Sequence, residues 1–515
     1  NQVQMSQDPQ LKKIRKALIS VYHKDGLEEI VNELHKGGVE IISTGGTYDF
    51  LRSRGIPVTA VEDITGYPSI FGGRVKTLHP KVFGGILYRR DLEGDLSQRD
   101  EFEIPDIDLV IVDLYPFEEY VAAKAEHQAI IEKIDIGGIS LIRAAAKNYN
   151  DVIIVPCSEE YGKLLEVLQN HGCASTLQER EYFAAKAFLT SSHYDTMIFD
   201  YFNRTTRFPV FDKSITKTMH LRYGENPHQE GVYFGAQDSL PKQLHGKEIS
   251  YNNLLDIEAA IELISDFSDP AVAIIKHNNA CGCAVRETIL QAWKDALSAD
   301  PVSAFGGIIV ANRCVDAASA EEINKIFFEV IIAPEYDEDA LAILKTKKNR
   351  IILKNNKITP SEEKFRSLLG GVLLQKRDSV VETPQDLKVV TETAPSAAEI
   401  EDMLFANILV KHSKSNAIVL AKNRMLLASG IGQTSRVDAL RQAIEKAGSF
   451  ELSLEGAVMS SDAFFPFPDC VEIAHKAGVK AVIHPGGSIR DQESVDYCNE
   501  HGVAMVITGK RHFKH

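Results

Sequence analysis

The chain has 515 residues, of which 44% are hydrophobic and 25% charged, a composition typical of globular proteins. This length allows two or three domains, each with a core of its own. The formal net charge of −15 argues against general nucleic-acid binding, because that binding depends on a basic face that neutralises phosphates. Small anionic substrates are still compatible with it, since they need only a local basic pocket.

No apolar stretch approaches the ~20 residues that a membrane-spanning helix requires, and the N-terminal segment is polar, without the apolar core of a signal peptide. The seven cysteines are scattered and form no Cys-x-x-Cys pair. This pattern favours reduced thiols in the cytoplasm over a disulfide framework. We therefore expect a cytoplasmic protein that takes small molecules as substrates and binds neither nucleic acid nor membranes.

The N-terminal part of the chain alternates between strand and helix patterns. Residues 16–22 predict a buried strand, and residues 24–38 predict an amphipathic helix that ends at a glycine pair. Residues 107–117 and 151–156 predict further strands. Strands separated by helices in this way predict an α/β fold with a parallel sheet.

After a helical stretch at 160–203, residues 203–213 are typical of a linker, and a second unit follows. No internal repeat is convincing in its sequence. The lysine-rich stretch 344–357 has the charge pattern of a solvated surface hairpin. The strand and turn patterns of this unit, separated by helices, lie at 271–285, 302–312, 415–432 and 479–488.

Residues 43–47, Ser-Thr-Gly-Gly-Thr, lie between a predicted strand and a predicted helix. Paired glycines there let backbone N–H groups approach an anion, and the hydroxyls of Thr44 and Thr47 offer further donors. The alternative is an ordinary tight turn, which the spacing alone favours. Because the sequence contains no G-x-G-x-x-G or P-loop motif, it does not support a nucleotide-cofactor domain.

Two later stretches concentrate cations beside glycines. In residues 72–85, two glycine pairs bracket Arg74, Lys76, His79 and Lys81, which predicts an anion site, with a solvated basic loop as the alternative. In residues 134–151, Asp135 and Gly137-Gly138 precede a helix that carries Arg143 and Lys147 on one face. Lys147 is an acid/base candidate if it is desolvated; otherwise it is an exposed cation favoured by the helix dipole.

In the second unit, the stretch 271–283 reads Ala-Val-Ala-Ile-Ile-Lys-His-Asn-Asn-Ala-Cys-Gly-Cys. A zinc deaminase would show His-x-Glu and Pro-Cys-x-x-Cys, so the spacing of Cys281 and Cys283 argues against zinc. Lys276 and His277 are then either a general base with a neighbouring cation or polar residues at a strand end, and the dipeptide alone leaves these equal. Residues 461–469 place three phenylalanines between prolines, as a core segment or as a pocket for a flat ring.

Taken together, these stretches resemble one family from about residue 15 to the end, namely the bifunctional purine-biosynthesis enzymes that join AICAR transformylase to IMP cyclohydrolase. The stretches that carry the resemblance, in the family's order, are STGGT, GGRVKTLHP, DLYPF, IDIGGISLIRAAAKN, LRYGENPHQ, IIKHNNACG, SAFGG, SNAIVLAKN, QTSR and SDAFFPF.

The resemblance implies an α/β fold in which residues 14–205 form a methylglyoxal-synthase-like cyclohydrolase domain with a parallel sheet. Residues 206–515 would form the transformylase, built from two cytidine-deaminase-like α/β subdomains without zinc. The family transfers a formyl group from 10-formyltetrahydrofolate, its cosubstrate, to the 5-amino group of AICAR, and then closes FAICAR to IMP with loss of water. No metal is required, and a homodimer with transformylase sites at the subunit interface is implied.

The resemblance also implies roles for individual residues. In the N-terminal site, the implied ring-closure residues are Lys76, Tyr115, Asp135 and Lys147, and the implied phosphate and ribose binders are Lys24, Thr44, Gly45, Gly46, Thr47, Arg74, Lys76, Thr77 and Gly137. In the C-terminal site, proton transfer falls to Lys276 and His277, and the implied binders of AICAR or folate are Arg222, Tyr223, His228, Asn253, Gly306, Asn416, Arg436, Phe464, Asp469, Ser488 and Arg511. The chain departs from the family's usual residues at Tyr22-His23, Asp113 and Glu329.

The chemistry suits this assignment. The amine of AICAR is a weak nucleophile, so a base such as His277 must take its proton, and a cationic Lys276 would keep His277 unprotonated while serving the leaving nitrogen of folate. Ring closure is intramolecular and gains mainly from orientation and charge stabilisation. Two other readings are a non-catalytic nucleotide-binding regulator on the same fold and a phosphate-eliminating lyase of the methylglyoxal-synthase type.

Overall fold

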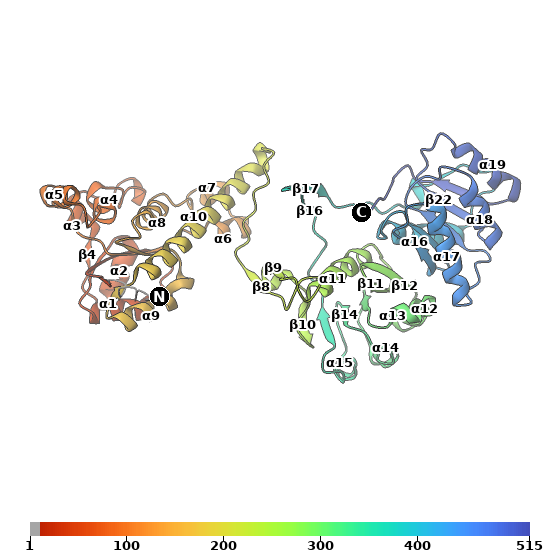
Figure 1. The fold of residues 1–515 in the computed structure, drawn as a ribbon, viewed down its shortest axis with the longest axis horizontal. Helices are drawn as coiled ribbons and strands as arrows, with labels where there is room; N and C mark the ends of the chain where they lie inside the picture. Colours follow the sequence, from red (N-terminus) through yellow and green to blue (C-terminus); the bar gives the residue numbers. More distant parts are fainter. Residues whose placement is uncertain (1–10) are drawn as a thin grey trace, which may run out of the picture. The chain divides into compact units, whose positions relative to one another are not determined.

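The computed structural model describes residues 11–515, so most of the polar N-terminal segment lies outside the described residues. The chain divides into two compact units, the first ending at Thr216 and the second running from Lys217 to His515. Figure 1 shows both units as ribbons. Within residues 11–515, no helix is both long and apolar enough to cross a membrane.

The first unit is built on a five-stranded parallel sheet in the order β4-β3-β2-β5-β6. Because helices cover both faces, the inner strands are almost continuously apolar and buried, as a parallel sheet requires. The expectation of an α/β fold with a parallel sheet is therefore confirmed. The strands are β2 (Lys16–Val21), β3 (Glu40–Ser43), β4 (Thr59–Ala60), β5 (Leu109–Asp113) and β6 (Ile153–Val155), with a separate antiparallel pair β1 (Lys12–Lys13) and β7 (Ala174–Ser175).

Apolar periodicity fixes the helices that cover this sheet. Helix α1 (Leu27–Lys36) buries Leu27, Ile30, Val31 and Leu34, and each such side chain contributes roughly 1.5–3 kcal/mol when fully buried. The remaining helices are α2 (Gly45–Ser53), α3 (Val61–Thr65), α4 (Pro80–Leu87), α5 (Glu93–Glu101), α6 (Phe117–Ala122), α7 (His127–Ile131), α8 (Gly137–Lys147), α9 (Tyr161–His171) and α10 (Leu177–Thr206).

The second unit contains one twelve-stranded sheet with an internal repeat. Its order is β10-β15-β14-β13-β11-β12 followed by β20-β19-β21-β22-β23-β18. Each half has an antiparallel hairpin at the centre, three mutually parallel strands beyond it and an antiparallel strand at the edge. The halves join where β12 pairs with β20 at Ala284 and Met425. No sign of this repeat is convincing in the sequence alone, but its two halves match the two α/β subdomains implied by the resemblance.

Helices repeat in the same way. Helices α11 and α16 pack on one face of the sheet, and two sets, α12, α14 and α15 in the first half and α17 to α19 in the second, pack on the other. The strands are β10 (Lys242–His245), β11 (Ala271–Lys276), β12 (Asn279–Val285), β13 (Ile308–Ala311), β14 (Val330–Ala333), β15 (Ile351–Lys354), β18 (Lys388–Val389), β19 (Ile418–Lys422), β20 (Met425–Gly430), β21 (Val458–Ser461), β22 (Ala481–His484) and β23 (Ala504–Ile507). The helices are α11 (Tyr251–Ile264), α12 (Ile289–Ala299), α13 (Pro301–Ala304), α14 (Ala317–Ile323), α15 (Glu338–Leu344), α16 (Ala397–Lys411), α17 (Arg436–Ser449), α18 (Asp469–Ala477) and α19 (Asp491–His501).

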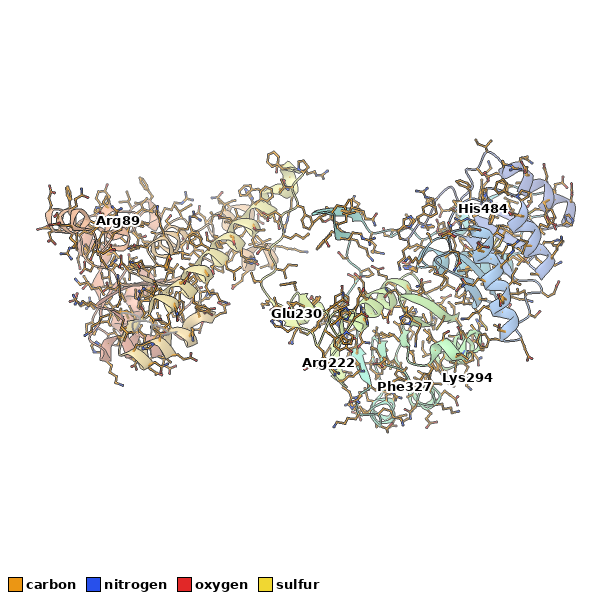
Figure 2. The ribbon with its side chains drawn as sticks, viewed as in Figure 1. Arg89, Arg222, Glu230, Lys294, Phe327 and His484 are labelled. Carbon is orange, nitrogen blue, oxygen red and sulfur yellow. The ribbon has the colours of Figure 1, made fainter. Side chains whose placement is uncertain are left out.

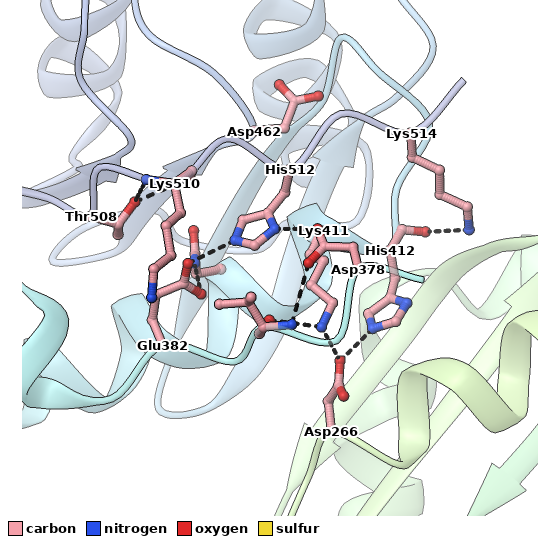
Figure 3. A network of polar contacts seen from close by, with 12 residues as sticks. Asp266, Asp378, Glu382, Lys411, His412, Asp462, Thr508, Lys510, His512 and Lys514 are labelled. Atoms are coloured by element: carbon pink, nitrogen blue, oxygen red, sulfur yellow. Dashed lines mark hydrogen bonds and ion pairs between the residues drawn. The ribbon is translucent and has the colours of Figure 1, made fainter. Parts of the chain in front are cut away.

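Two hairpins lie outside this sheet, β8 (Thr218–His220) with β9 (Val232–Phe234), and β16 (Glu363–Leu368) with β17 (Gly371–Lys376). The predicted surface hairpin at 344–357 is wrong: residues 351–354 are strand β15, whose Ile351, Ile352 and Leu353 are fully buried. A buried ion pair ties the halves together, because Asp266 accepts hydrogen bonds from Lys411 Nζ at 2.9 Å and from His412 Nε2 at 2.6 Å (Figure 3).

Candidate active sites

The first unit holds a cavity of about 760 Å³ at the carboxyl ends of its central strands. Segments that directly follow β2, β3 and β5 line it, together with the loop before α4 and the start of α8. This edge is where open parallel sheets bind their ligands. The described lining includes the predicted residues Lys24, Thr44, Gly46, Thr47, Arg74, Lys76, Thr77, Tyr115, Asp135 and Gly137.

Lys76 lies against the glycine turn that opens α2. A methyl group built on Gly45 would be 3.5 Å from Lys76 Nζ, and one built on Gly73 would be 3.7 Å from it. Gly45 has φ +55, a conformation in which a side chain is strained. The ammonium group therefore sits where the N–H groups of a helix N-terminus converge, an arrangement suited to an anion.

The predicted donor role of two hydroxyls is not supported by their contacts. Thr44 Oγ1 donates to Glu62 at 2.9 Å, and Thr47 Oγ1 donates to the backbone oxygen of Val21 at 3.0 Å. Both threonines are almost completely buried. The turn thus presents its backbone N–H groups to the cavity, while the two hydroxyls stabilise the turn itself.

Asp135 is buried at the start of α8. Its carboxylate accepts hydrogen bonds from the backbone of Gly138 at 2.6 Å, Ile139 at 3.3 Å and Tyr115 at 3.3 Å. Burial raises the pKa of Asp135, although these hydrogen bonds and the charge of Lys76 oppose the rise. Burial, followed by the charge of Asp135, also raises the pKa of the Tyr115 hydroxyl.

Lys147 does not line this cavity. It ends α8, whereas Gly137 begins it, so the two lie about 15 Å apart along the helix axis. Leu141, Ile142 and Ala145 are buried on the inner face as predicted, and Lys147 is exposed. Lys147 therefore lacks the desolvation that an acid/base lysine needs and matches the alternative of an exposed cation. Its catalytic role stays a prediction.

One cation of the site was missed by sequence reasoning. Lys133 Nζ lies 5.0 Å from the ring centre of Tyr22, 5.7 Å from that of Tyr115 and 4.7 Å from that of Tyr120. Tyr22 follows β2, whereas Tyr115 and Tyr120 lie in one stretch after β5 and Lys133 lies in another, so no local pattern could reveal this cage. Tyr22 is one of the departures from the family's usual residues.

Two pairs of residues at the site already contact each other. His23 and Asp113, two further departures from the family's usual residues, form the first pair, with His23 Nδ1 3.0 Å from Asp113 Oδ2. Arg74, a predicted phosphate binder, forms an ion pair with Glu132 on the cavity wall. Lys24 donates to the backbone oxygens of Val21 and Tyr22, and burial lowers its pKa, with Asp113 opposing and Lys76 reinforcing that shift.

In the second unit, Lys276 ends β11 and His277 begins the two-residue turn to β12. His277 and Asn278 both have positive φ, 49° and 67°, as a type I′ hairpin turn requires. Strand β11 is buried over Ala271–Ile275, whereas His277 is exposed at its tip. The expected buried apolar strand that leads into Lys276 and His277 is therefore present.

Neighbouring groups hold this turn in place. Asp256 of α11 accepts a hydrogen bond from the Asn278 N–H at 2.7 Å, and Lys276 Nζ donates to the backbone oxygen of Phe305 at 2.6 Å. Gly306 has φ +73, and a methyl group built on it would lie 3.2 Å from Lys276 Nζ. Lys276 and Gly306, both predicted site residues, are thus in direct proximity.

Asn279 links this turn to the second half of the sheet. Its amide donates to the His277 backbone oxygen at 2.8 Å, and its Oδ1 accepts from the Lys414 N–H at 3.1 Å. A cavity of about 250 Å³ beside it is lined by Lys276, Asn279, Asp300 and Lys446, among others.

The predicted binders of the second unit fall into two groups, one on each half. In the first half, Asn253 forms the capping box of α11 with Ser250 and is buried, while the Arg222 guanidinium lies 5.7 Å from the Tyr223 ring centre (Figure 2). The Asn252 amide donates to the backbone oxygen of Glu225 at 3.2 Å, which joins the loop that carries Arg222, Tyr223 and His228 to α11.

The second group centres on Arg436, which is buried. Arg436 forms an ion pair with Asp462 and donates to Asn416 Oδ1 at 2.7 Å. The remaining members lie on surface segments: Phe464 and Phe467 are half-exposed while Phe465 is fully buried, so the phenylalanine run is partly core and partly surface. Asp469 and Ser488 hydrogen-bond to local backbone, and Arg511 stacks on Phe513 with 4.1 Å to the ring centre.

Within residues 11–515, no group of three or more His, Cys, Asp or Glu side chains is arranged to hold a metal ion. Cys281 and Cys283 pack on opposite faces of the sheet.

The fold and these clusters define an α/β enzyme of two units, each with a candidate site lined by cations and glycine turns. A model of the MGS-like domain matches residues 26–140, and a model described as the AICARFT/IMPCHase bienzyme matches residues 145–446. The chain belongs to the AICARFT/IMPCHase bienzyme family.

Curated relatives match nearly the whole chain. A "Bifunctional purine biosynthesis protein PurH" of Bacteroides thetaiotaomicron is 63% identical over 98% of this chain and 99% of its own length. Proteins of the same name from Persephonella marina and Aquifex aeolicus are 48% and 47% identical, each over 97% of this chain and 100% of their own length.

Proposed function

We propose that the first unit carries the IMP cyclohydrolase activity and the second unit the AICAR transformylase activity of this bifunctional purine-biosynthesis enzyme. The enzyme uses 10-formyltetrahydrofolate as its cosubstrate, forms FAICAR from AICAR and closes FAICAR to IMP. The observation that carries the assignment is the match of family and relatives across both units. We take 14–205 and 206–515 as the two functional domains, and the boundary between compact units at Thr216 supports a division in this region.

For ring closure, the carboxamide nitrogen of FAICAR attacks its own formyl carbon, and water then leaves. Lys76 and the N–H groups at the start of α2 would hold the phosphate or the developing oxyanion, since both are anions. Asp135 and Tyr115 face the same cavity and would move the protons of the attacking and leaving groups. Because the reaction is intramolecular, orientation by the cavity walls accounts for much of its rate.

For formyl transfer, the AICAR amine attacks the formyl carbon of the cosubstrate, a new N–C bond forms and the bond to N10 of folate breaks. His277 would accept the amine proton, and Lys276 would donate to the leaving N10. The hairpin and Asp256 support this role, because they hold the dipeptide at a fixed position. Gly306, Asn253 and the loop from Arg222 to His228 would bind AICAR.

We further propose a homodimer in the cytoplasm. The predicted binders of the second unit lie in two groups, and the resemblance implies that such groups meet across a subunit interface. The hairpin of β16 and β17 supports an interface, because Leu369, Leu373 and Leu374 on it are exposed, at 103%, 57% and 49%. Sedimentation analysis of the purified protein would test the dimer.

One coupled assay tests the whole assignment. Purified protein with AICAR and 10-formyltetrahydrofolate should give IMP, identified by product analysis. A nucleotide-binding regulator would bind AICAR without turnover, and a lyase of the methylglyoxal-synthase type would act on triose phosphates instead. Failure to form either FAICAR or IMP would reject the assignment.

A further inference from the structure

A buried histidine of the C-terminal tail, His512, lies between the carboxylates of Asp378 and Glu382. The His512 side chain is 3% exposed; its Nδ1 lies 2.5 Å from Asp378 Oδ2 and its Nε2 lies 2.7 Å from Glu382 Oε1 (Figure 3). An imidazole can donate from both nitrogens only when it is protonated. The geometry therefore calls for a cationic ring.

The surroundings keep that cation in place. Burial alone would lower the pKa of His512, but the hydrogen bonds and charges of Asp378 and Glu382 together raise it to about 9. Helix α16 contributes Asn407, which donates to Glu382 at 2.8 Å, and Lys411, whose charge helps to lower the pKa of Asp378. Along the tail, Lys510 pairs with Asp386.

The tail around His512 also forms hydrogen bonds with the segments that carry the second group of site residues. The backbone N–H of His512 donates to the backbone oxygen of Asp462 at 3.1 Å, and the Asp462 carboxylate forms an ion pair with Arg436. Two residues further on, the Lys514 N–H donates to Ser415 Oγ at 3.1 Å, and the Ser415 N–H donates to the Lys514 oxygen at 2.9 Å. Ser415 Oγ in turn donates to Asp462.

We propose that His512 is a positioning residue of the transformylase site, which holds the tail residues 511–514 against the segment that carries Asn416 and Arg436. Arg511 is thereby fixed beside the same segment. This inference rests on the proposed function of the second unit, and nothing in it requires His512 to touch a substrate. The ring acts through the backbone of the tail and through Asp462 and Ser415.

The test compares His512→Gln and Glu382→Gln with the wild-type enzyme, and uses His501→Gln, an exposed histidine on α19, as the control. In His512→Gln the KM for AICAR should rise about tenfold or more, the size expected for loss of a charge-assisted hydrogen bond, while kcat changes less and ring closure of FAICAR stays normal. His501→Gln should leave both activities unchanged.

A pH series separates positioning from mere folding. In the wild type, the KM for AICAR should rise as the pH passes about 9, because His512 then loses its proton. Glu382→Gln removes one of the two carboxylates that raise the pKa, so the same rise should begin at a lower pH. An unchanged KM and pH profile in both folded variants would overturn the inference, as would equal loss of both activities. A wild-type enzyme without formyl transfer would instead reject the proposed function.

Discussion

His277 and Asn423 occupy equivalent positions in the two halves of the twelve-stranded sheet. Each is the first residue of a two-residue hairpin turn, with φ of 49° and 54°, and each follows a lysine, Lys276 or Lys422. The lysines also match, since Lys276 Nζ donates to the oxygen of Phe305 at 2.6 Å and Lys422 Nζ donates to that of Glu455 at 2.7 Å.

The helix before each hairpin completes the match. Asp256 of α11 accepts from the Asn278 N–H at 2.7 Å, and Asp402 of α16 accepts from the Asn423 and Arg424 N–H groups at 2.9 and 2.8 Å. The positive φ of His277 is therefore a property of the repeated hairpin rather than strain specific to catalysis. Among the four side chains of the two turns, the imidazole of His277 is the only one that can serve as a general base.

The first prediction compares substitutions of His277 and Asn423. His277→Ala should lower the rate of formyl transfer by roughly 10²–10⁴-fold, the usual effect of removing a general base. Ring closure of supplied FAICAR should continue at close to the normal rate, because its site lies in the other unit. Both activities are measured on one folded preparation.

Asn423→Ala is the matched control, since it changes the same turn position without removing an imidazole. It should retain formyl transfer. If His277→Ala transferred the formyl group normally, or if the two variants lost formyl transfer equally, His277 would be a structural turn residue.

The parallel sheet of the first unit could be predicted because its strands are buried on both faces and so read as continuous apolar runs, such as Ile153–Val155. The repeat of the second unit could not, because it is preserved in strand order and turn geometry while its side chains differ, as His277 and Asn423 illustrate. At 344–357, the flanking lysines indicated solvent, but three apolar residues, Ile351 to Leu353, suffice for a buried parallel strand.

In the candidate sites, too, some residues could be predicted from local sequence and others could not. Glycine pairs beside cations led to Lys76 and the turn at Gly45, which lie together in the cavity. The Lys133 cage and the Arg74–Glu132 pair depend on contacts between distant segments, so no local pattern reports them. Lys147 shares a motif with Asp135, yet the length of α8 keeps the two apart.

The second prediction compares these two lysines of the first unit. Lys76→Met should lower ring closure by about 10²-fold or more, because a preorganised cation facing the developing charge is lost. Lys147→Ala should lose less, since Lys147 is exposed and outside the cavity. The measurement is IMP formation from supplied FAICAR, with formyl transfer as the internal control. An equal or greater loss in Lys147→Ala would bring the end of α8 into the site.

The third prediction concerns Gly306, whose added methyl group would meet Lys276 Nζ at 3.2 Å. Gly306→Ala should lower formyl transfer about tenfold, through displacement of the lysine and the cost of a side chain at φ +73. Gly456→Ala is the control, because it has φ +75 and would meet Lys422 Nζ at the same 3.2 Å. If both variants lost formyl transfer equally, backbone strain rather than the position of Lys276 would be the cause.

The last prediction is that purified enzyme carries no stoichiometric zinc and that chelators leave formyl transfer unchanged. In the β11–β12 hairpin, Ile274 pairs with Gly282 and Ile275 with Ala280, so Cys281 is the extra residue of a bulge. The bulge turns its side chain to the opposite face from Cys283, and the two thiols cannot bind one ion. Burial raises the pKa of Cys281 to about 12 and also raises that of Cys283, so neither is the thiolate that zinc prefers. Elemental analysis tests this prediction. One zinc per chain would contradict it, because the protein would then bind zinc through a ligand set that these two cysteines do not provide.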